Sequence, residues 1–113
     1  MNESLSQKQC VPCEGGVAPL DESAAKGMME KLANDWQLSE DARTLSRTVR
    51  FRNYHETMAF VNAVAWIAHQ QDHHPDMAVS YNQCRVDFAT HAIGGLSEND
   101  FICAAKVDQL LHT

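Results

Sequence analysis

The spacing of apolar residues along the chain predicts three amphipathic helices. The first begins at Asp21, which is suited to cap a helix N-terminus, and the second runs from Tyr54 to about Gln70. The third begins at Ser97, because Asp100 follows three residues later in the arrangement of a capping box. The three apolar stripes consist of Ala25, Met28, Met29 and Leu32; Met58, Val61, Val64, Ala65 and Ala68, broadened by Phe60 and Ile67; and Phe101, Ala104, Ala105, Val107 and Leu111.

Alternation of apolar and polar residues predicts two β-hairpins, one within residues 36–51 and one within residues 76–91. In the first hairpin Arg47 interrupts the apolar face and does not fit the pattern. In the second, alternate residues from Cys84 to Thr90 form an apolar face that should meet the helices, which leaves His91 on or near the opposite side.

The predicted order of elements is α-β-β-α-β-β-α, which is typical of an α+β fold. We therefore expect a four-stranded antiparallel sheet with three helices packed on one face. A chain of 113 residues is long enough for one hydrophobic core, and association with further copies would help to stabilise so small a domain.

Residues 1–19 are polar and follow neither the helical nor the strand period, so we expect an N-terminal arm followed by a compact domain over residues 20–113. The arm contains the sequence CVPCEGG, with Cys10 and Cys13 two residues apart. A redox motif is disfavoured, because the pair does not follow a strand of a βαβ unit. Two thiols in a structured or partner-contacting arm are the simpler interpretation.

Composition excludes several classes of function. The formal net charge is −6, and no cluster of Lys or Arg is suited to bind nucleic acid directly. No apolar run approaches the roughly 20 residues of a membrane span, and the polar start lacks the layout of a signal peptide. We expect a cytoplasmic protein that does not bind membranes and whose four cysteines are free thiols.

Three of the six histidines lie in the stretch HQQDHHPD, residues 69–76. Pro75 disfavours helical geometry at His74, so the second helix should end at or before the pair His73-His74 and leave it on a turn. A turn could also bring His91 back towards this pair. The simplest interpretation is surface imidazoles near a helix C-terminus, where the helix dipole favours a protonated ring.

A metal site and a metal-free acid/base site are the two other interpretations. The imidazoles of His69, His73, His74 and His91, or the two arm cysteines, could ligate a metal. Zinc is disfavoured, because CVPC has no second CxxC or HxxxH partner at a familiar spacing and the adjacent His73 and His74 usually point in different directions. Imidazole has an ordinary pKa of about 6.5, so converging rings can donate and accept protons near neutral pH. Motifs for a covalent nucleophile or a nucleotide are missing from the sequence.

The histidines are part of a longer series of residues. His69 is followed after three residues by His73-His74-Pro75, after five more by Tyr81, after nine more by His91, and after eight more by Asp100. This series resembles the signature of the pterin-4a-carbinolamine dehydratases, and the likeness extends from about Leu20 to Leu111. The arm with CVPCEGG resembles that of a bacterial and plant-type subgroup.

The resemblance implies a four-stranded antiparallel sheet with three helices on one face. It also implies a hydro-lyase that dehydrates 4a-hydroxytetrahydropterin to quinonoid dihydropterin in the recycling of a tetrahydropterin cofactor. The C4a hydroxyl leaves as water with the help of a general acid, while N5 loses its proton. Neither a metal nor a cofactor is expected.

Carried over to this sequence, the resemblance implies that His73, His74 and His91 are the catalytic residues. We expect His74 and His91 to transfer protons at the hydroxyl and N5, and His73 to bind and polarise the substrate. Pro75 should fix the turn that presents the pair. The substrate-binding residues implied are His73, His74, Pro75, Thr90, His91, Ala92, Ile93 and Asp100.

Two of these assignments have a structural alternative. Tyr81 could pack beside the site, although an aromatic residue at a strand end is more often part of the core. Asp100 could contact the substrate or a histidine, or act only as the carboxylate of the capping box that begins at Ser97.

The family also implies a homodimer or homotetramer, assembled through the sheet and helices. Some animal members act in addition as dimerisation cofactors of a homeodomain transcription factor. A non-catalytic binding protein, either a dimerisation cofactor or a chaperone-like partner, is therefore the alternative function. Such a role would use interface surface and would not need the complete set of histidines.

Overall fold

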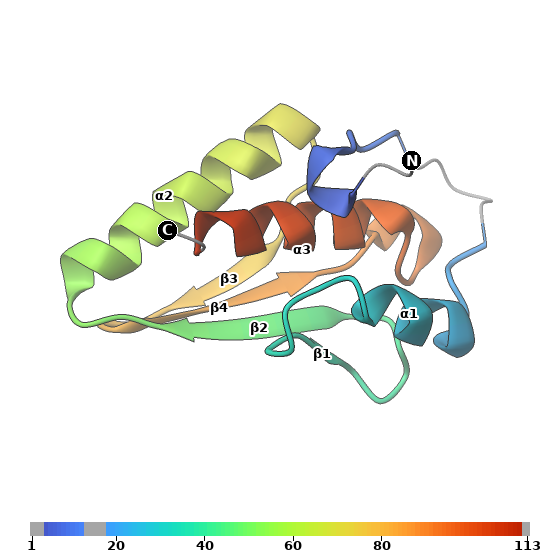
Figure 1. Ribbon diagram of the computed structural model, residues 1–113, viewed down its shortest axis with the longest axis horizontal. Helices are drawn as coiled ribbons and strands as arrows, with labels where there is room; N and C mark the ends of the chain where they lie inside the picture. The colour runs from blue at the N-terminus through green and yellow to red at the C-terminus, as the bar shows by residue number, and fades with distance from the viewer. Residues whose placement is uncertain (1–3, 13–17, 112–113) are drawn as a thin grey trace.

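The computed structural model describes residues 4–12 and 18–111 (Figure 1). A four-stranded antiparallel sheet has the order β1-β2-β4-β3, and α2 and α3 lie together on the same side of it. This confirms the α+β fold and the predicted order of elements. The elements are η1 (Leu5–Gln7), α1 (Glu22–Met29), β1 (Gln37–Leu38), β2 (Leu45–Arg50), α2 (Tyr54–Gln71), β3 (Asp76–Val79), β4 (Gln83–Phe88), η2 (His91–Ile93) and α3 (Glu98–Leu110).

Side-chain caps fix where the helices begin. The Asp21 side chain accepts a hydrogen bond from the backbone N–H of Ala24, as its position predicted. Ser97 and Asp100 form the predicted capping box at the start of α3. At its other end, α2 stops at Asp72, whose φ of 50° is left-handed, so the histidine pair lies beyond the helix as expected.

The core lies between the helices and the two central strands. Leu45 pairs with Phe88 and Val49 with Cys84 across β2 and β4, and all four side chains are buried. The apolar face predicted from Cys84 to Thr90 is therefore confirmed. Burial of these side chains on one face fixes the register, because a slip of one residue would turn them to the opposite face.

Arg47 lies on the buried side of β2 because two carboxylates neutralise it. Its Nη1 donates to Oδ1 of Asp108 at 2.6 Å, and its Nη2 donates to Oδ2 of Asp35 at 2.9 Å. Asp108 also accepts a hydrogen bond from Nε1 of Trp36 at 2.7 Å. This network explains why a charged residue interrupts the apolar alternation of the first hairpin.

The N-terminal arm packs against the domain over its described part. η1 lies against α3, and the Leu5 side chain is 5% exposed within the hydrophobic core. Nζ of Lys106 in α3 also donates to the carbonyl oxygen of Ser6 at 2.8 Å. A single apolar residue in a polar segment forms no periodic pattern, so this contact could not be predicted from the sequence. Cys13 lies outside the described residues.

Candidate active site

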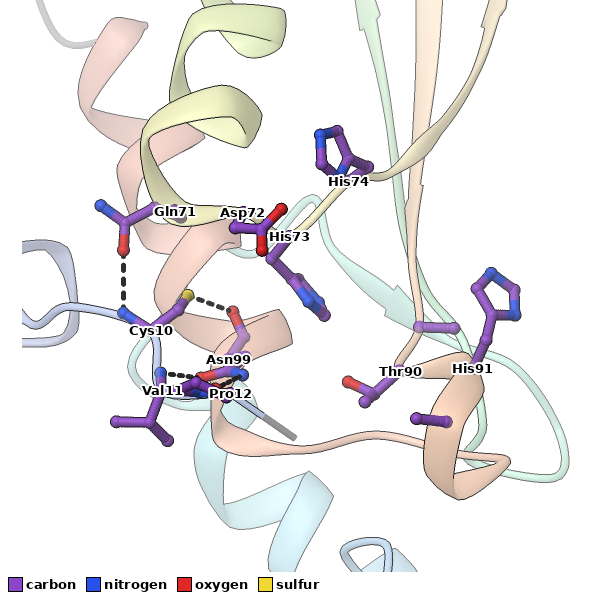
Figure 2. A pocket seen from close by; sticks show the side chains of 12 residues that line it. Cys10, Val11, Pro12, Gln71, Asp72, His73, His74, Thr90, His91 and Asn99 are labelled. Atoms are coloured by element: carbon purple, nitrogen blue, oxygen red, sulfur yellow. Dashed lines mark hydrogen bonds between the residues drawn. The ribbon is translucent and has the colours of Figure 1, made fainter. Parts of the chain in front are cut away.

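A cavity of about 510 Å³ opens where the end of α2, the end of β4 and the start of α3 meet (Figure 2). His73 and His74 reach it from the segment after α2, and His91 reaches it from the segment after β4. Residues that are 17 positions or more apart in the sequence thus share one cavity, as the likeness of the histidine series implied. Thr90 and Ala92, two further predicted site residues, also line it.

A buried carboxylate supports the first of these imidazoles. Nε2 of His73 donates to Oδ1 of Asp100 at 2.6 Å, and the Asp100 side chain is 0% exposed. Its other oxygen, Oδ2, accepts from the Thr90 hydroxyl at 2.7 Å and from the backbone N–H of Ser97 at 3.0 Å. Asp100 was expected either to contact a histidine or substrate or to complete the capping box. Its carboxylate both caps α3 and accepts the hydrogen bond from His73.

This arrangement favours the protonated form of His73. The hydrogen bond to Asp100 raises the pKa of His73 above its ordinary value of 6.5, while burial of the ring opposes the rise. The imidazole also stacks on the ring of Phe88, with centroids 6.3 Å apart and planes 8° from parallel. The ring is thus fixed in orientation, and Nδ1 is the ring nitrogen that Asp100 does not contact.

Other predicted site residues lie away from the cavity wall. Pro75 and Ile93 do not line the cavity, and Asp100 is connected to it through His73. His69, considered above as a metal ligand, packs against Trp66 on α2, with ring centroids 5.4 Å apart.

Tyr81 contributes neither to this site nor to the core, so both alternatives for it are wrong. It is 63% exposed in the turn between β3 and β4, and its ring stacks on that of Tyr54 with centroids 6.3 Å apart. Tyr54 begins α2, whereas the cavity lies at the other end of that helix, about 27 Å away at 1.5 Å per residue. Side chains in a strand point alternately to the two faces of the sheet, and this alternation is the basis for predicting burial. Tyr81 lies in a turn, where the alternation does not apply.

The arm supplies a wall of the cavity that the sequence did not predict. Cys10, Val11 and Pro12 line it beside Gln71 and Asn99. The backbone N–H of Cys10 donates to Oε1 of Gln71 at 2.8 Å, and that of Val11 donates to Oδ1 of Asn99 at 3.0 Å. The Asn99 amide donates back to the carbonyl oxygen of Val11. The motif CVPC marked this segment as unusual. Its contacts could not be predicted from the motif, because the residues that bind the arm are about 60 to 90 positions away in the chain.

Among residues 4–12 and 18–111, no group of three or more His, Cys, Asp or Glu side chains is placed to hold a metal ion. In the same described part of the chain, every helix is too short or too polar to cross a membrane.

Comparison with known proteins adds the family. The model of the family described as pterin 4 alpha carbinolamine dehydratase matches residues 18–110. The chain belongs to this family. The family that the histidine series resembles is thereby confirmed.

Curated relatives of the pterin 4 alpha carbinolamine dehydratase family match nearly the whole chain. A protein of Nitrosomonas eutropha is 63% identical over 95% of this chain and 93% of its own length. A protein of Legionella pneumophila is 52% identical over 98% of both chains. Both proteins are provisionally named pterin-4-alpha-carbinolamine dehydratase.

Two solved structures share the fold. The transcriptional coactivator/pterin dehydratase of Brucella melitensis superposes with a TM-score of 0.76 at 28% identity, over 81% of this chain and 97% of its own. A pterin dehydratase-like protein identified as a RuBisCO assembly factor in the alpha-carboxysome has a TM-score of 0.59 at 22% identity, over 68% and 89%. The second likeness concerns the fold alone.

Proposed function

We propose that this protein dehydrates 4a-hydroxytetrahydropterin to quinonoid dihydropterin and water, and so takes part in recycling a tetrahydropterin cofactor. One observation carries the proposal: three imidazoles line a single cavity, and a buried carboxylate supports one of them. The cavity volume of about 510 Å³ lies within the range of sites for small molecules, roughly 300–1,000 Å³. Membership of the family supplies the class of substrate.

His73 binds and polarises the substrate in this proposal. Asp100 occupies its Nε2 and favours the imidazolium form, so Nδ1 can donate a charge-assisted hydrogen bond to a pterin oxygen or nitrogen. Polarisation of the pterin ring makes the N5–H more acidic, which favours loss of the N5 proton. Asp100 acts through His73 and is a positioning residue.

His74 and His91 transfer the protons. One ring, in its protonated form, donates to the C4a hydroxyl as the C–O bond breaks and water leaves. The other, in its neutral form, accepts the N5 proton while the N5 lone pair forms the C4a=N5 bond. The two rings reach the cavity from different segments, so they can act on different atoms of the same substrate.

The remaining predicted residues position the flat pterin ring. Thr90 and Ala92 line the cavity beside His91 and contact the edge of the ring in this proposal, whereas Ile93 does not line the cavity. Pro75 restrains the turn that carries His74. Carbinolamine dehydration already proceeds in water, so the 10²- to 10⁴-fold acceleration typical of positioned acid/base groups is the contribution we assign to the histidines.

The test is the rate at which 4a-hydroxytetrahydropterin, generated in place by a pterin-dependent hydroxylase, loses water with the purified protein. We expect acceleration that survives a chelator and falls at least about 10²-fold in His91→Ala. His55→Ala is the matched control, because His55 is exposed near the opposite end of α2. Equal rates of dehydration with and without the wild-type protein would refute the proposed dehydratase activity.

The same experiment separates the alternative, a non-catalytic binding protein. One of the two solved structures is described as a coactivator as well as a pterin dehydratase, and the other, a pterin dehydratase-like protein, as an assembly factor. A binding role would leave dehydration at its uncatalysed rate and the His91→Ala variant indistinguishable from wild type. The complete set of histidines around one cavity favours catalysis.

We further propose that the protein works in the cytoplasm as a homodimer or homotetramer. Trp66 on α2 is 60% exposed and Val79 on the edge strand β3 is 42% exposed, as expected where copies associate through helices and sheet. Cys10, Cys84 and Cys103 are free thiols, which suits a reducing compartment. Sedimentation velocity that returns the mass of a single chain would refute the oligomer.

A further inference from the structure

Two cysteines that are 93 residues apart in the chain meet beside the cavity. Sγ of Cys10 lies 3.5 Å from Sγ of Cys103, whereas a disulfide joins its sulfurs at about 2.05 Å. The sulfurs therefore need to approach by only about 1.5 Å to be joined. Cys10 lines the cavity and is partly exposed, while Cys103 is 0% exposed within α3. A reagent that enters the cavity meets Cys10 first.

The surroundings make the two thiols unequal. The hydrogen bond from Cys103 lowers the pKa of Cys10, and the positive charge of His73 acts in the same direction against the effect of burial. The shared hydrogen bond and burial raise the pKa of Cys103. Because the thiolate is the reactive form, Cys10 is the nucleophile of the pair and Cys103 the partner that reacts second.

The arm is held so that Cys10 stays in place. Its backbone N–H bonds to Gln71, and the next residue, Val11, exchanges two hydrogen bonds with the Asn99 side chain. The Cys10 thiol also donates to the carbonyl oxygen of Asn99 at 3.6 Å. Asn99 and Cys103 are one turn apart on α3, so the same helix anchors the arm and presents the second thiol.

We propose that Cys10 and Cys103 form a reversible intramolecular disulfide when a peroxide enters the cavity, and that this bond fastens the N-terminal arm to α3 as a wall of the site. The modification differs from a pairing within CVPC, because it joins the arm to the domain instead of closing a loop inside the arm.

The chemistry requires one equivalent of hydrogen peroxide as the oxidant. The Cys10 thiolate attacks one peroxide oxygen, an S–O bond forms, the O–O bond breaks, and hydroxide leaves and is protonated to water. Cys103 then loses its proton and attacks the Cys10 sulfur, an S–S bond forms, and the sulfenic hydroxyl leaves as a second water. Two thiols lose two electrons in all, and the peroxide gains them.

The test uses the full chain, reduced and then treated with hydrogen peroxide. Free thiols are blocked with N-ethylmaleimide and the protein is mapped by mass spectrometry of its peptides. We expect Cys10 linked to Cys103, Cys13 and Cys84 alkylated, and the link reversed by dithiothreitol. The Cys13→Ser variant is the matched control and should form the same link. In Cys103→Ala the reaction should stop at a Cys10 sulfenic acid that dimedone captures.

A link between Cys10 and Cys13, a link between two chains, or reduced cysteines throughout would overturn the proposal. Hydrogen exchange on the wild-type protein tests the fastening of the arm without any variant that could fail to fold. Amides of residues 8–11 should exchange more slowly in the oxidised than in the reduced protein, by about tenfold or more, while those of β2 and β4 stay unchanged. Equal exchange in the arm would refute the fastening. The readouts are covalent mass and exchange, so they do not depend on the proposed dehydratase activity.

Discussion

Replacing Asp100 with asparagine removes the charge beneath His73 and keeps most of the side chain's shape. The amide oxygen of Asn can take the place of Oδ2 and keep the hydrogen bonds from Thr90 and from the backbone of Ser97. The amide nitrogen then faces Nε2 of His73, where the carboxylate oxygen lies 2.6 Å away in the wild type. An amide N–H can donate to a neutral imidazole but repels the N–H of an imidazolium.

The expected cost depends on pH with a definite sign. In the wild-type fold the pKa of His73 is raised above its unfolded value of 6.5 by Asp100. Its contribution to the free energy of unfolding is therefore complete below 6.5 and is lost as the pH rises through the folded pKa. In Asp100→Asn the hydrogen bond and the charge of Asp100 are lost, so burial lowers the pKa of His73 and only the charges of Cys10 and Asp72 oppose it. The variant should lose about 1.5–3 kcal/mol at acidic pH, the contribution of a hydrogen bond to a charged group.

Urea denaturation of both proteins between about pH 5 and pH 9 measures this cost, since histidine titrates within that interval. Long-range nitrogen–proton NMR of His73 in the same samples gives its pKa directly. Asp76→Asn is the control, because Asp76 is exposed on β3 and its substitution should cost no more than about 0.5 kcal/mol at any pH. A cost for Asp100→Asn that is equal at both ends of the range, or a pKa of His73 that does not fall, would refute the reasoning.

Two further predictions concern stability away from the histidines. Arg47→Ala leaves the carboxylate of Asp108, whose side chain is 9% exposed, without its cation, so urea denaturation should show a loss of about 3–5 kcal/mol. Arg85→Ala is the control, because Arg85 is exposed. If Arg47→Ala lowers the free energy of unfolding no more than Arg85→Ala does, the ion pair between Arg47 and Asp108 does not stabilise the fold. Leu5→Ala should cost about 2–5 kcal/mol in the same measurement, because Leu5 is buried in the core. A cost near zero would mean that the arm does not contribute to folding.

Local patterns in the sequence were sufficient to predict the three α-helices, the four strands and their order. Helix starts at Asp21 and Ser97 depend on side chains that bond within the next three residues. That α2 ends before His74 follows from Pro75, whose ring disfavours helical geometry in the residue before it. Each of these effects acts over a few residues, so a single sequence contains all that is needed to predict it.

The likeness of the histidine series to a family signature added the expectation that His73, His74 and His91 share a site. Spacing alone left surface imidazoles and a metal site open, because it does not say where distant segments meet. The structure brings the three rings to one cavity, whereas it places Tyr81 at the far end of α2. Membership of the series was thus a poor guide to the position of Tyr81, which lies in a turn.

Only the tertiary structure decided which partners the charged and thiol groups have. Asp108 neutralises Arg47 from 61 residues away, Asn99 holds Val11 across 88 residues, and Cys10 reaches a second thiol beside the cavity. The sequence by itself determined the periodic faces and the caps, since these follow from backbone geometry within one element. Contacts between elements depend on how those faces pack, and packing is a property of the whole chain that no local pattern records.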